Sequence, residues 1–448
     1  MNQPVTLPLW AFVLIVLFAA VTFASHFLFP SVRWFFRKRA ERLVARLNER
    51  LQRPIEPFKL AERHDMIQRL LYDPVIGQAV VDHAREYDVP ENVAFEKARV
   101  YAREIVPSFS ATAYFTFGMR LARWLTRMLY RVRLGAFDRD ALENLDKDAT
   151  VIFVMNHRSN MDYVLVTHLV SRASALSYAV GEWARVWPLS AVIRAMGAYF
   201  IRRRSRTALY RSVLARYVQM STEGGVTQAM FPEGGLSLTG QVGTPKLGLL
   251  SYIVSNYENG GRDVVFVPVA LNYDQVIEDR FLIKAGKDGK RRFRPPAWTV
   301  IRSTWAYFWR RLTGKFKGFG TASVAFGAPL TLSTFEAQDD LTEEVGTELM
   351  TRIKDVIPVL AAPLVARAIV ENGADTREAI ITAVEDMIKG LKTKGMPLPR
   401  RDTPDLVDET LARFRIRKLI ARDPAQVRLV HDGADVLGYY AQTIVHHF

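Results

Sequence analysis

Between about residue 150 and residue 330, the sequence alternates short apolar runs rich in β-branched residues with segments of helical periodicity. This alternation is typical of an α/β domain, in which helices cover a sheet. The strands expected here are Val151–Met155, Ala198–Arg202, Gln228–Phe231, Val264–Ala270 and Ala322–Phe326, and the helices are Asp162–Ser171, Thr207–Ser221 and Lys246–Tyr257.

The sequence on either side of this domain is mainly helical in pattern. We expect a helical region over residues 36–105, the α/β domain over residues 106–330, and a second helical region over residues 331–448. The last of these includes predicted helices at Ala361–Glu371 and Thr376–Lys392.

The first 35 residues are predicted to form a transmembrane anchor. No charged residue precedes Arg33, and the apolar run Leu9–Phe29 makes a helix of about 31 Å, which matches a bilayer core. A buried core helix is the weaker alternative, because such helices seldom run this long without a charge. The basic cluster that begins at Arg33 predicts a single-pass protein of the cell inner membrane, with everything after it on the cytoplasmic side.

The net charge of +15 is concentrated in two stretches. Residues 33–53 sum to +6 and residues 280–317 to +11, so the other 389 residues sum to −2. Such basic surfaces indicate an anionic partner: membrane headgroups, nucleic acid or a phosphorylated substrate. Aromatic residues alternate with the basic ones in the second stretch and could stack on bases, but no nucleic-acid-binding signature accompanies them. We therefore expect membrane lipids as the partner and no nucleic acid.

A basic and apolar segment precedes the α/β domain. Arg120, Arg123, Arg127 and Arg131 recur at helical spacing opposite Leu, Trp and Met side chains. This pattern predicts an amphipathic helix in the headgroup region of a membrane, or an ordinary surface helix with a solvated basic face. The nearby predicted span favours the membrane.

Several kinds of chemistry are excluded by missing residues. The chain has no cysteine, which rules out disulfides, iron–sulfur ligation and a cysteine nucleophile. It also lacks the G-x-S-x-G, G-x-x-x-x-G-K-[ST] and H-E-x-x-H motifs. We expect no metal site.

The segment VIFVMNHRSNMDYVLV carries the first candidate catalytic residues. An apolar strand ends at Met155, a polar loop follows, and a helix begins near Asn160. With His157 in the loop and Asp162 in the first helical turn, the carboxylate can reach one ring nitrogen of the histidine. The other nitrogen is then free to take a proton from a hydroxyl group.

Three later segments add candidate ligand-binding residues. Arg202 and Arg203 end a strand, where α/β domains bind ligands and where arginine suits a phosphate. In the turn FPEGG, Glu233 is followed by Gly234 and Gly235, which let a ligand approach the backbone. Pro268 interrupts the buried strand VVFVPVALNYD and predicts an edge or a strand end near the site.

These segments together resemble the glycerolipid acyltransferase family, and most closely its bacterial glycerol-3-phosphate acyltransferases. Four family blocks occur in order, as HRSNMD (157–162), GAYFIRR (197–203), FPEGG (231–235) and VPVALNYD (267–274). The resemblance covers about residues 106–330, with a weaker echo in the last 12 residues, LGYYAQTIVHHF. It implies a mixed sheet flanked by helices.

The resemblance also implies a role for each matched residue. His157 is the expected general base, and Asp162 orients it. Arg202 and Arg203 bind the acceptor phosphate, while Glu233, Gly234, Gly235 and Pro268 line the acceptor site. The acyl donor is a thioester of coenzyme A or acyl carrier protein, used as a cosubstrate, and no cofactor is implied.

One departure from the family leaves the acceptor open. The third block usually continues with arginines, but here Leu236 and Leu238 stand in those positions. An arginine contact to phosphate contributes about 1.5–3 kcal/mol, so Lys246 or Arg203 must compensate if the acceptor is glycerol 3-phosphate. The alternative acceptor is lysophosphatidate or another lipid alcohol.

Overall fold

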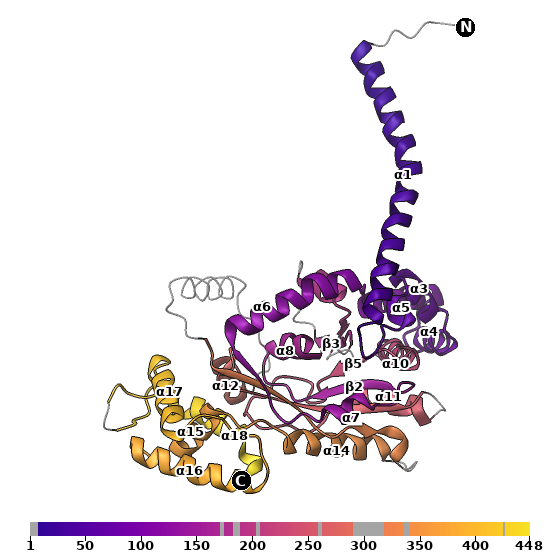
Figure 1. The fold of residues 1–448 in the computed structure, drawn as a ribbon. Helices are drawn as coiled ribbons and strands as arrows, with labels where there is room; N and C mark the ends of the chain where they lie inside the picture. Colours follow the sequence, from indigo (N-terminus) through magenta and orange to yellow (C-terminus); the bar gives the residue numbers. More distant parts are fainter. Residues whose placement is uncertain are drawn as a thin grey trace, which may run out of the picture. The chain divides into compact units, whose positions relative to one another are not determined.

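The computed structural model describes residues 8–170, 174–181, 189–202, 207–258, 262–289, 318–335, 340–423 and 426–448, without the side chains of residues 20–37, 40 and 189. The chain divides into two units, residues 1–54 and residues 55–448 (Figure 1). Most of the basic stretch 280–317, together with Arg203, lies outside the described residues.

The first unit contains one long helix, α1 (Leu9–Asn48), which begins at the predicted apolar run and continues well past it. Among the described residues, no helix combines the length and apolar character needed to cross a membrane. Part of the run Leu9–Phe29 consists of side chains outside the description, and the predicted span stays a prediction.

The second unit is built on a mixed sheet flanked by helices, as the resemblance implies. Its strands in the described residues lie in the order β1-β7-β6-β2-β5-β3-β4, and β8 also pairs with β6. Strands β6, β2, β5, β3 and β4 are parallel, whereas β7 and β8 run antiparallel to β6. The strands are β1 (Arg131–Leu134), β2 (Thr150–Met155), β3 (Ser177–Gly181), β4 (Tyr199–Ile201), β5 (Gln228–Met230), β6 (Val264–Tyr273), β7 (Thr321–Phe326) and β8 (Leu330–Thr331).

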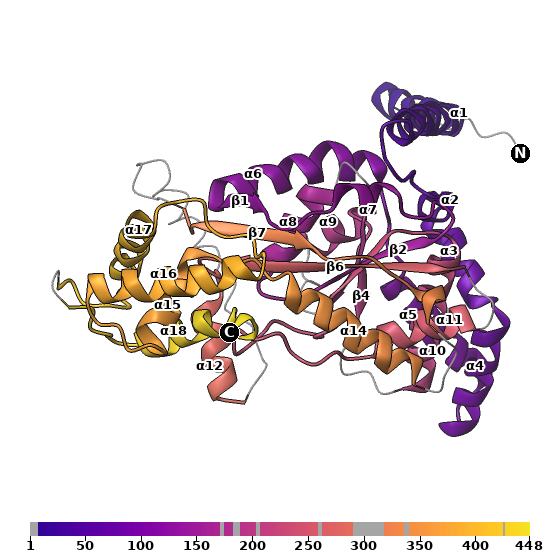
Figure 2. The same ribbon diagram turned by 60° about the horizontal axis from the view of Figure 1, so that its bottom comes forward.

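Helices cover both faces of this sheet (Figures 1 and 2). The helices of the second unit that the argument uses are α2 (Pro57–Leu60), α3 (Arg63–Leu71), α4 (Pro74–Glu86), α5 (Glu91–Ile105), the π-helix η1 (Ala113–Gly118), α6 (Met119–Leu129), α8 (Met161–Val170), α10 (Ala208–Glu223), α11 (Gly248–Glu258), α12 (Asp279–Lys287), α14 (Leu341–Asp355), α15 (Ala361–Val370), α16 (Arg377–Thr393), α17 (Thr403–Ile416), α18 (Gly433–Gln442) and the short η4 (Val445–His447).

Alternate residues of β2 belong to two different hydrophobic cores. Val151, Phe153 and Met155 pack in a cluster with α8 and the C-terminal helices α15–α18. Ile152 and Val154 pack in another cluster with α4, α5, α10, α11 and α14. A strand places successive side chains on opposite faces, so β2 is buried on both sides, as central strands of α/β sheets are.

The expected strands are confirmed with shifts of up to three residues, but β1, β3 and β8 were not predicted. The expected helical position of Arg131 is wrong, because α6 ends at Leu129 and Arg131 begins β1. Tyr130, between α6 and β1, has an extended backbone conformation. Its hydroxyl donates to the Gln275 carbonyl at 2.9 Å, and its ring packs against Tyr273. A pairing partner distant in sequence thus overrides the helical pattern.

The expected edge position of Pro268 is also wrong, since β6 is a central strand that continues five residues beyond it. Antiparallel pairing with β8 covers Val265 and Phe266, and pairing with β7 begins at Val269. Pro268 faces the gap between these partners, where its carbonyl accepts from Gly327 N at 2.9 Å. No ladder hydrogen bond is lost there, and this is why a central strand tolerates a proline.

Candidate active site

The structure brings His157 and Asp162 together across the loop between β2 and α8. The ring Nδ1 of His157 lies 2.9 Å from Asp162 Oδ2, and both side chains are buried. This contact directs Nε2 away from the carboxylate. Nε2 is therefore the ring nitrogen that can receive a proton from a bound hydroxyl group.

Further donors hold the Asp162 carboxylate. Its Oδ2 accepts from the backbone amides of Arg158 and Ser159 at 2.7 and 3.0 Å. Its Oδ1 accepts from the Tyr273 hydroxyl at 2.6 Å. Burial raises the pKa of Tyr273 well above its usual value, so this hydroxyl stays a neutral donor. Both carboxylate oxygens are thus fixed, and Asp162 in turn fixes the His157 ring.

Aromatic rings enclose the histidine. The Phe231 ring stacks on His157 at 4.0 Å between centroids, and the Tyr163 ring meets it edge-on at 5.6 Å. Phe231 follows β5, the parallel neighbour of β2, so the sheet itself sets this stacking. The rings restrict the imidazole to one orientation relative to Asp162.

The loop that carries His157 is anchored to β6 and to the segment after it. The Asn156 side chain donates to the Leu271 carbonyl at 3.0 Å and accepts from the Leu271 amide at 2.7 Å. On the other side, Glu278 accepts from the Ser159 hydroxyl at 2.8 Å and from Asn160. Burial raises the Glu278 pKa, and these hydrogen bonds oppose the rise.

Glu233 links the loop of His157 to the turn that follows β5. Its two carboxylate oxygens accept from the backbone amides of His157 and Gly243 at 2.8 and 3.1 Å. Burial raises the pKa of Glu233, and the Arg158 guanidinium opposes that rise. Glu233 therefore acts on the catalytic loop through the backbone.

Lys246 lies over the same turn. Gly234 has φ +64°, a conformation that favours glycine, and a Cβ there would lie 2.7 Å from Lys246 Cδ, so the lysine side chain runs directly over the glycine. The Lys246 amide donates to the Pro232 carbonyl at 2.8 Å. The turn continues at Gly235, which is buried. The positively charged Lys246 thus lies over the turn whose Glu233 binds the backbone of His157.

Arg202 is engaged elsewhere. It follows β4 at the sheet edge, three strands from β2, which corresponds to about 14 Å between strand axes. Its guanidinium makes a two-pronged contact with Glu104 of α5, at 2.8 and 2.5 Å, beside the rings of Tyr101 and Tyr210. The hydrogen bond to Glu104 raises the Arg202 pKa further. The structure does not bring Arg202 into contact with His157.

The other predicted positions are also located. Leu236 and Leu238 are partly buried against the hydrophobic core. Pro268 lies in the middle of β6 rather than at its carboxyl end. Among the described residues, no three His, Asp or Glu side chains are grouped closely enough to hold a metal ion.

Residues that the sequence reasoning did not select also build this site. Tyr273, Asn156, Glu278 and Phe231 all contact the pair or its loop. Tyr273 stands at the end of the strand VVFVPVALNY, and a polar residue at a strand end is a signal that could have identified it. Glu278 carries no such signal, because it lies beyond the matched blocks.

Two family matches cover most of this second unit. Residues 138–272 match the acyltransferase family, and residues 307–448 match the glycerol-3-phosphate acyltransferase C-terminal region.

Curated relatives named glycerol-3-phosphate acyltransferase occur in several bacteria. The protein of Actinobacillus succinogenes is 28% identical over 87% of this chain and 50% of its own length, and that of Pseudoalteromonas atlantica is 27% identical over 90% and 52%. The Shewanella amazonensis protein is 30% identical over 71% of this chain and 39% of its own length. The chain thus spans about half the length of the first two relatives.

A solved structure, the 1-acyl-sn-glycerophosphate acyltransferase of Thermotoga maritima, is 21% identical and covers 53% of this chain and 77% of its own, with a TM-score of 0.32.

Proposed function

Since this chain belongs to the glycerolipid acyltransferase family, we propose that it transfers a fatty acyl group from an acyl thioester to the hydroxyl of glycerol 3-phosphate, giving 1-acylglycerol 3-phosphate. The observation that carries this proposal is the buried His157–Asp162 pair, held by donors from β6 and from its own loop. The donor is acyl coenzyme A or acyl carrier protein, and the chemistry requires no resident cofactor.

The proposed reaction uses His157 as a general base. Nε2 takes the proton of the acceptor hydroxyl as its oxygen attacks the thioester carbonyl carbon. The C–S bond of the resulting tetrahedral intermediate then breaks, and the departing sulfur receives the proton from the imidazolium. Asp162 keeps Nδ1 protonated throughout and stabilises the positive ring. The ester and the free thiol leave, and no acyl group is bound to the protein.

We further propose that Lys246 supplies the main positive charge for the acceptor phosphate. It accompanies the turn of Glu233, Gly234 and Gly235, which contacts the catalytic loop. The Arg202 guanidinium is already paired with Glu104 through Nε and Nη2, and Arg203 remains a proposed ligand outside the described residues.

The second candidate acceptor is lysophosphatidate or another lipid alcohol. The observation that favours it is the apolar pair Leu236 and Leu238, packed on the core next to the Glu233 turn where the family usually has arginines. An acceptor with an acyl chain would gain from apolar surface at this position, whereas a small phosphate ester would not.

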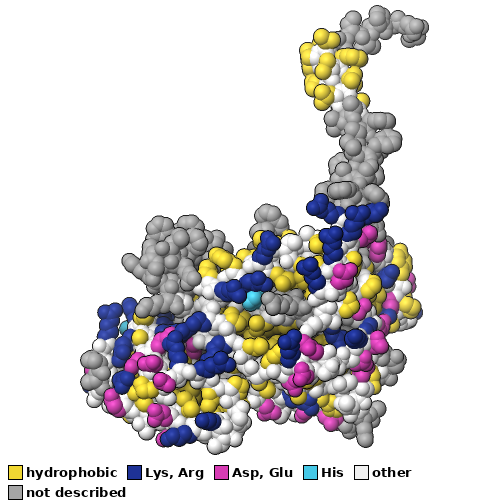
Figure 3. Space-filling view, in the orientation of Figure 1, with side chains coloured by type: hydrophobic (Ala, Val, Ile, Leu, Met, Phe, Trp, Pro, Cys, Tyr) yellow, Lys and Arg dark blue, Asp and Glu magenta, His cyan; other side chains and the backbone are white. Residues whose placement is uncertain are grey.

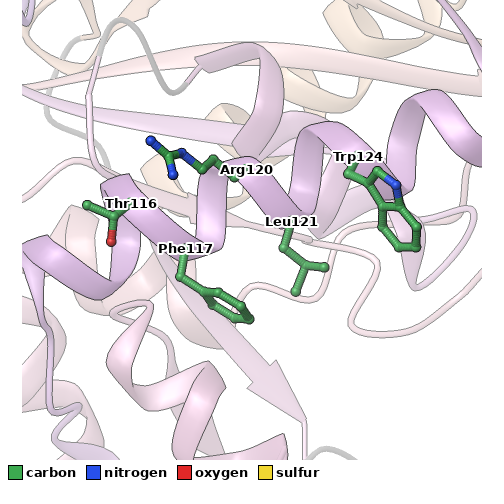
Figure 4. A pocket seen from close by; sticks show the side chains of 5 residues that line it. All are labelled: Thr116, Phe117, Arg120, Leu121 and Trp124. Atoms are coloured by element: carbon green, nitrogen blue, oxygen red, sulfur yellow. The ribbon is translucent and has the colours of Figure 1, made fainter.

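We propose attachment to the cytoplasmic face of a bilayer, through the apolar run of α1 and through η1 and α6, which carry Phe117 and Trp124 respectively. Phe117 and Trp124 are more than half exposed. Together with Leu121 they point in the same direction and line a shallow pocket of about 420 Å³ (Figure 4). Arg120, Arg123 and Arg127 are exposed on α6. Basic and hydrophobic side chains lie side by side on this face (Figure 3). Exposed aromatics beside arginines suit a headgroup layer.

Thiol release from acyl coenzyme A or acyl carrier protein, with glycerol 3-phosphate or lysophosphatidate as acceptor, tests the proposal. His157→Ala should lower kcat by about 10²- to 10⁴-fold, the usual contribution of a general base. The exposed His64 gives the matched control, and His64→Ala should keep the parent rate. Parent-like turnover by His157→Ala would exclude the mechanism, and turnover only with lysophosphatidate would establish the second acceptor.

A further inference from the structure

A tight turn over residues 237–241 lies against the catalytic loop. The Ser237 amide donates to the His157 carbonyl at 2.9 Å. The Ser237 hydroxyl closes the turn, because it donates to the Gln241 carbonyl at 2.7 Å and accepts from the Gly240 amide at 3.1 Å. A displacement of this turn would therefore be transmitted to the backbone of His157.

Arg158, the neighbour of the catalytic histidine, holds the other side of the turn. It is 1% exposed, and its Nη1 donates to the Gly240 carbonyl. The same guanidinium opposes the rise in the pKa of Glu233, whose carboxylate accepts from the His157 amide. Arg158 thus connects both supports of the catalytic loop, the Gly240 turn and Glu233.

Helix α18 of the C-terminal region contacts this turn directly. The Tyr439 carbonyl oxygen occupies the space that a Cβ at Gly240 would need, and Gly240 has φ +87°. Beside it, the side-chain amide of Gln241 donates to that of Gln442. The Tyr440 hydroxyl also donates to Asp279, the first residue of α12, at 2.6 Å, which connects α18 to α12. The helix therefore covers the turn with its backbone, and only glycine fits beneath it.

We propose that α18 is a positioning element for the active site, and that Gly240 and Arg158 are the residues through which it acts. The inference rests on the proposed function, which makes His157 the base. Contact with α18 holds the 237–241 turn against the catalytic loop. The turn then fixes the His157 carbonyl through Ser237, while Glu233 fixes the His157 amide and Arg158 holds the Gly240 carbonyl. The C-terminal region then sets the rate of the chemical step without touching the substrate.

Gly240→Ala in the full chain tests this inference. A methyl group at Gly240 must displace the Tyr439 carbonyl, so the turn moves and His157 shifts relative to the acceptor hydroxyl. We expect kcat to fall by about 10- to 100-fold with little change in KM, as for a catalytic group misplaced by a fraction of an ångström to 1 Å. Amide hydrogen exchange should rise in the segment 156–162.

Gly373→Ala provides the matched control. Gly373, in the C-terminal region, has a positive φ of +68° as Gly240 does, but no atom lies within 4 Å of its missing Cβ. It therefore imposes the same kind of backbone strain without the collision, and it should keep the parent kcat and the parent exchange in 156–162. Equal exchange in the two alanine variants would overturn the inference.

Gln442→Ala keeps the inference falsifiable if Gly240→Ala does not fold. It removes the side-chain hydrogen bonds of Gln442 with Gln241 and with Glu371, and of these two only the first reaches the turn. We expect a fall in kcat of about two- to fivefold and faster exchange in the turn, in line with the loss of one hydrogen bond. An unchanged turn would count against the role of α18. The exchange readout needs no substrate, so it separates a failure of this inference from a failure of the proposed acyl transfer.

Discussion

At the scale of single residues, the site depends on one carboxylate, Asp162, with both of its oxygens engaged. Asp162 receives hydrogen bonds from a histidine, two backbone amides and a tyrosine. An ionised carboxylate can only accept, so each lost donor leaves a buried lone pair unpaired and loosens the imidazole.

Tyr273→Phe should therefore lower kcat by about 5- to 10-fold and leave KM unchanged, because the ring stays while the donor to Asp162 is lost. Steady-state kinetics over a range of acceptor concentrations measures both constants. Tyr178 provides a matched buried hydroxyl, bonded to Thr167 at 2.8 Å, and Tyr178→Phe should behave like the parent protein. A rise in KM at constant kcat would show that Tyr273 binds substrate instead.

Lys246→Ala should raise KM for glycerol 3-phosphate by about 10- to 100-fold, equivalent to the 1.5–3 kcal/mol of a charge-assisted hydrogen bond. The activity on an uncharged lipid alcohol should change much less, since no phosphate is present to lose its partner. Initial rates with both acceptors measure the difference. An equal loss on both acceptors would mean that Lys246 only supports the turn at Gly234.

The residues predicted correctly to lie together are those that one short segment brings together. His157 and Asp162 are five positions apart in a strand-loop-helix segment, so the local pattern sufficed. The environment of Arg202 could not be predicted, because its partner Glu104 lies 98 positions earlier, on a helix that shows no chemistry of its own. A guanidinium at a strand end is consistent with a phosphate site, but here a carboxylate from another element pairs with it.

At the scale of elements, the C-terminal tail is sensitive to acid. Burial lowers the pKa of His446 to about 3, and burial also lowers that of His447, whose Nε2 lies 2.9 Å from the Ile357 carbonyl. The unfolded chain binds a proton at His446 near pH 6.5, but the folded chain binds it only near pH 3. The folded state is therefore favoured above pH 6.5 and loses that advantage as the pH falls toward 3.

His446→Gln should reduce this acid sensitivity. Between pH 7 and pH 5 the parent protein should lose about 1 kcal/mol more stability than the variant, after allowance for the partial exposure of His446. Urea unfolding at both pH values measures the difference. The exposed His431 lies in the same region, so His431→Gln is the control, and a parallel loss in His446→Gln and His431→Gln would contradict the assignment.

Predictions of elements succeeded best where the periodicity was sustained. The long helices α15 and α16 begin and end within one residue of their expected bounds. Strands β1, β3 and β8 were not expected, and shortness alone does not explain this, because β4 and β5 have only three residues each and were expected. For β1 the cause is the regular arginine spacing, which continues the helical pattern of α6 as far as Arg131. The position of Pro268 was mispredicted for a different reason. The gap between β8 and β7 that accommodates the proline depends on two other strands and cannot be inferred from the sequence of β6.

At the scale of the whole molecule, the exposed aromatic residues of η1 and α6 predict binding to a lipid surface. The double change Phe117→Ser with Trp124→Ser should weaken retention on vesicles containing anionic phospholipid by several-fold, and added salt should weaken the parent protein's binding further, because its arginines are screened. Cosedimentation measures both effects. Tyr72 is 73% exposed elsewhere in the same unit, so Tyr72→Ser is the control. Retention equal to the control would rule out α6 as a docking surface.

The order of the strands has a consequence for synthesis on the ribosome. Strand β1 pairs with β7, and Arg131 lies opposite Thr321, a partner 190 residues later. Strands β2, β5, β3 and β4 can associate as they emerge, but β6 waits for β7 and β8 to cover its far edge. A nascent chain about 280 residues long would thus present an uncovered central strand, an aggregation hazard. Chaperone capture is then most valuable just before residues 321–331 emerge, and the finished sheet closes only after they do.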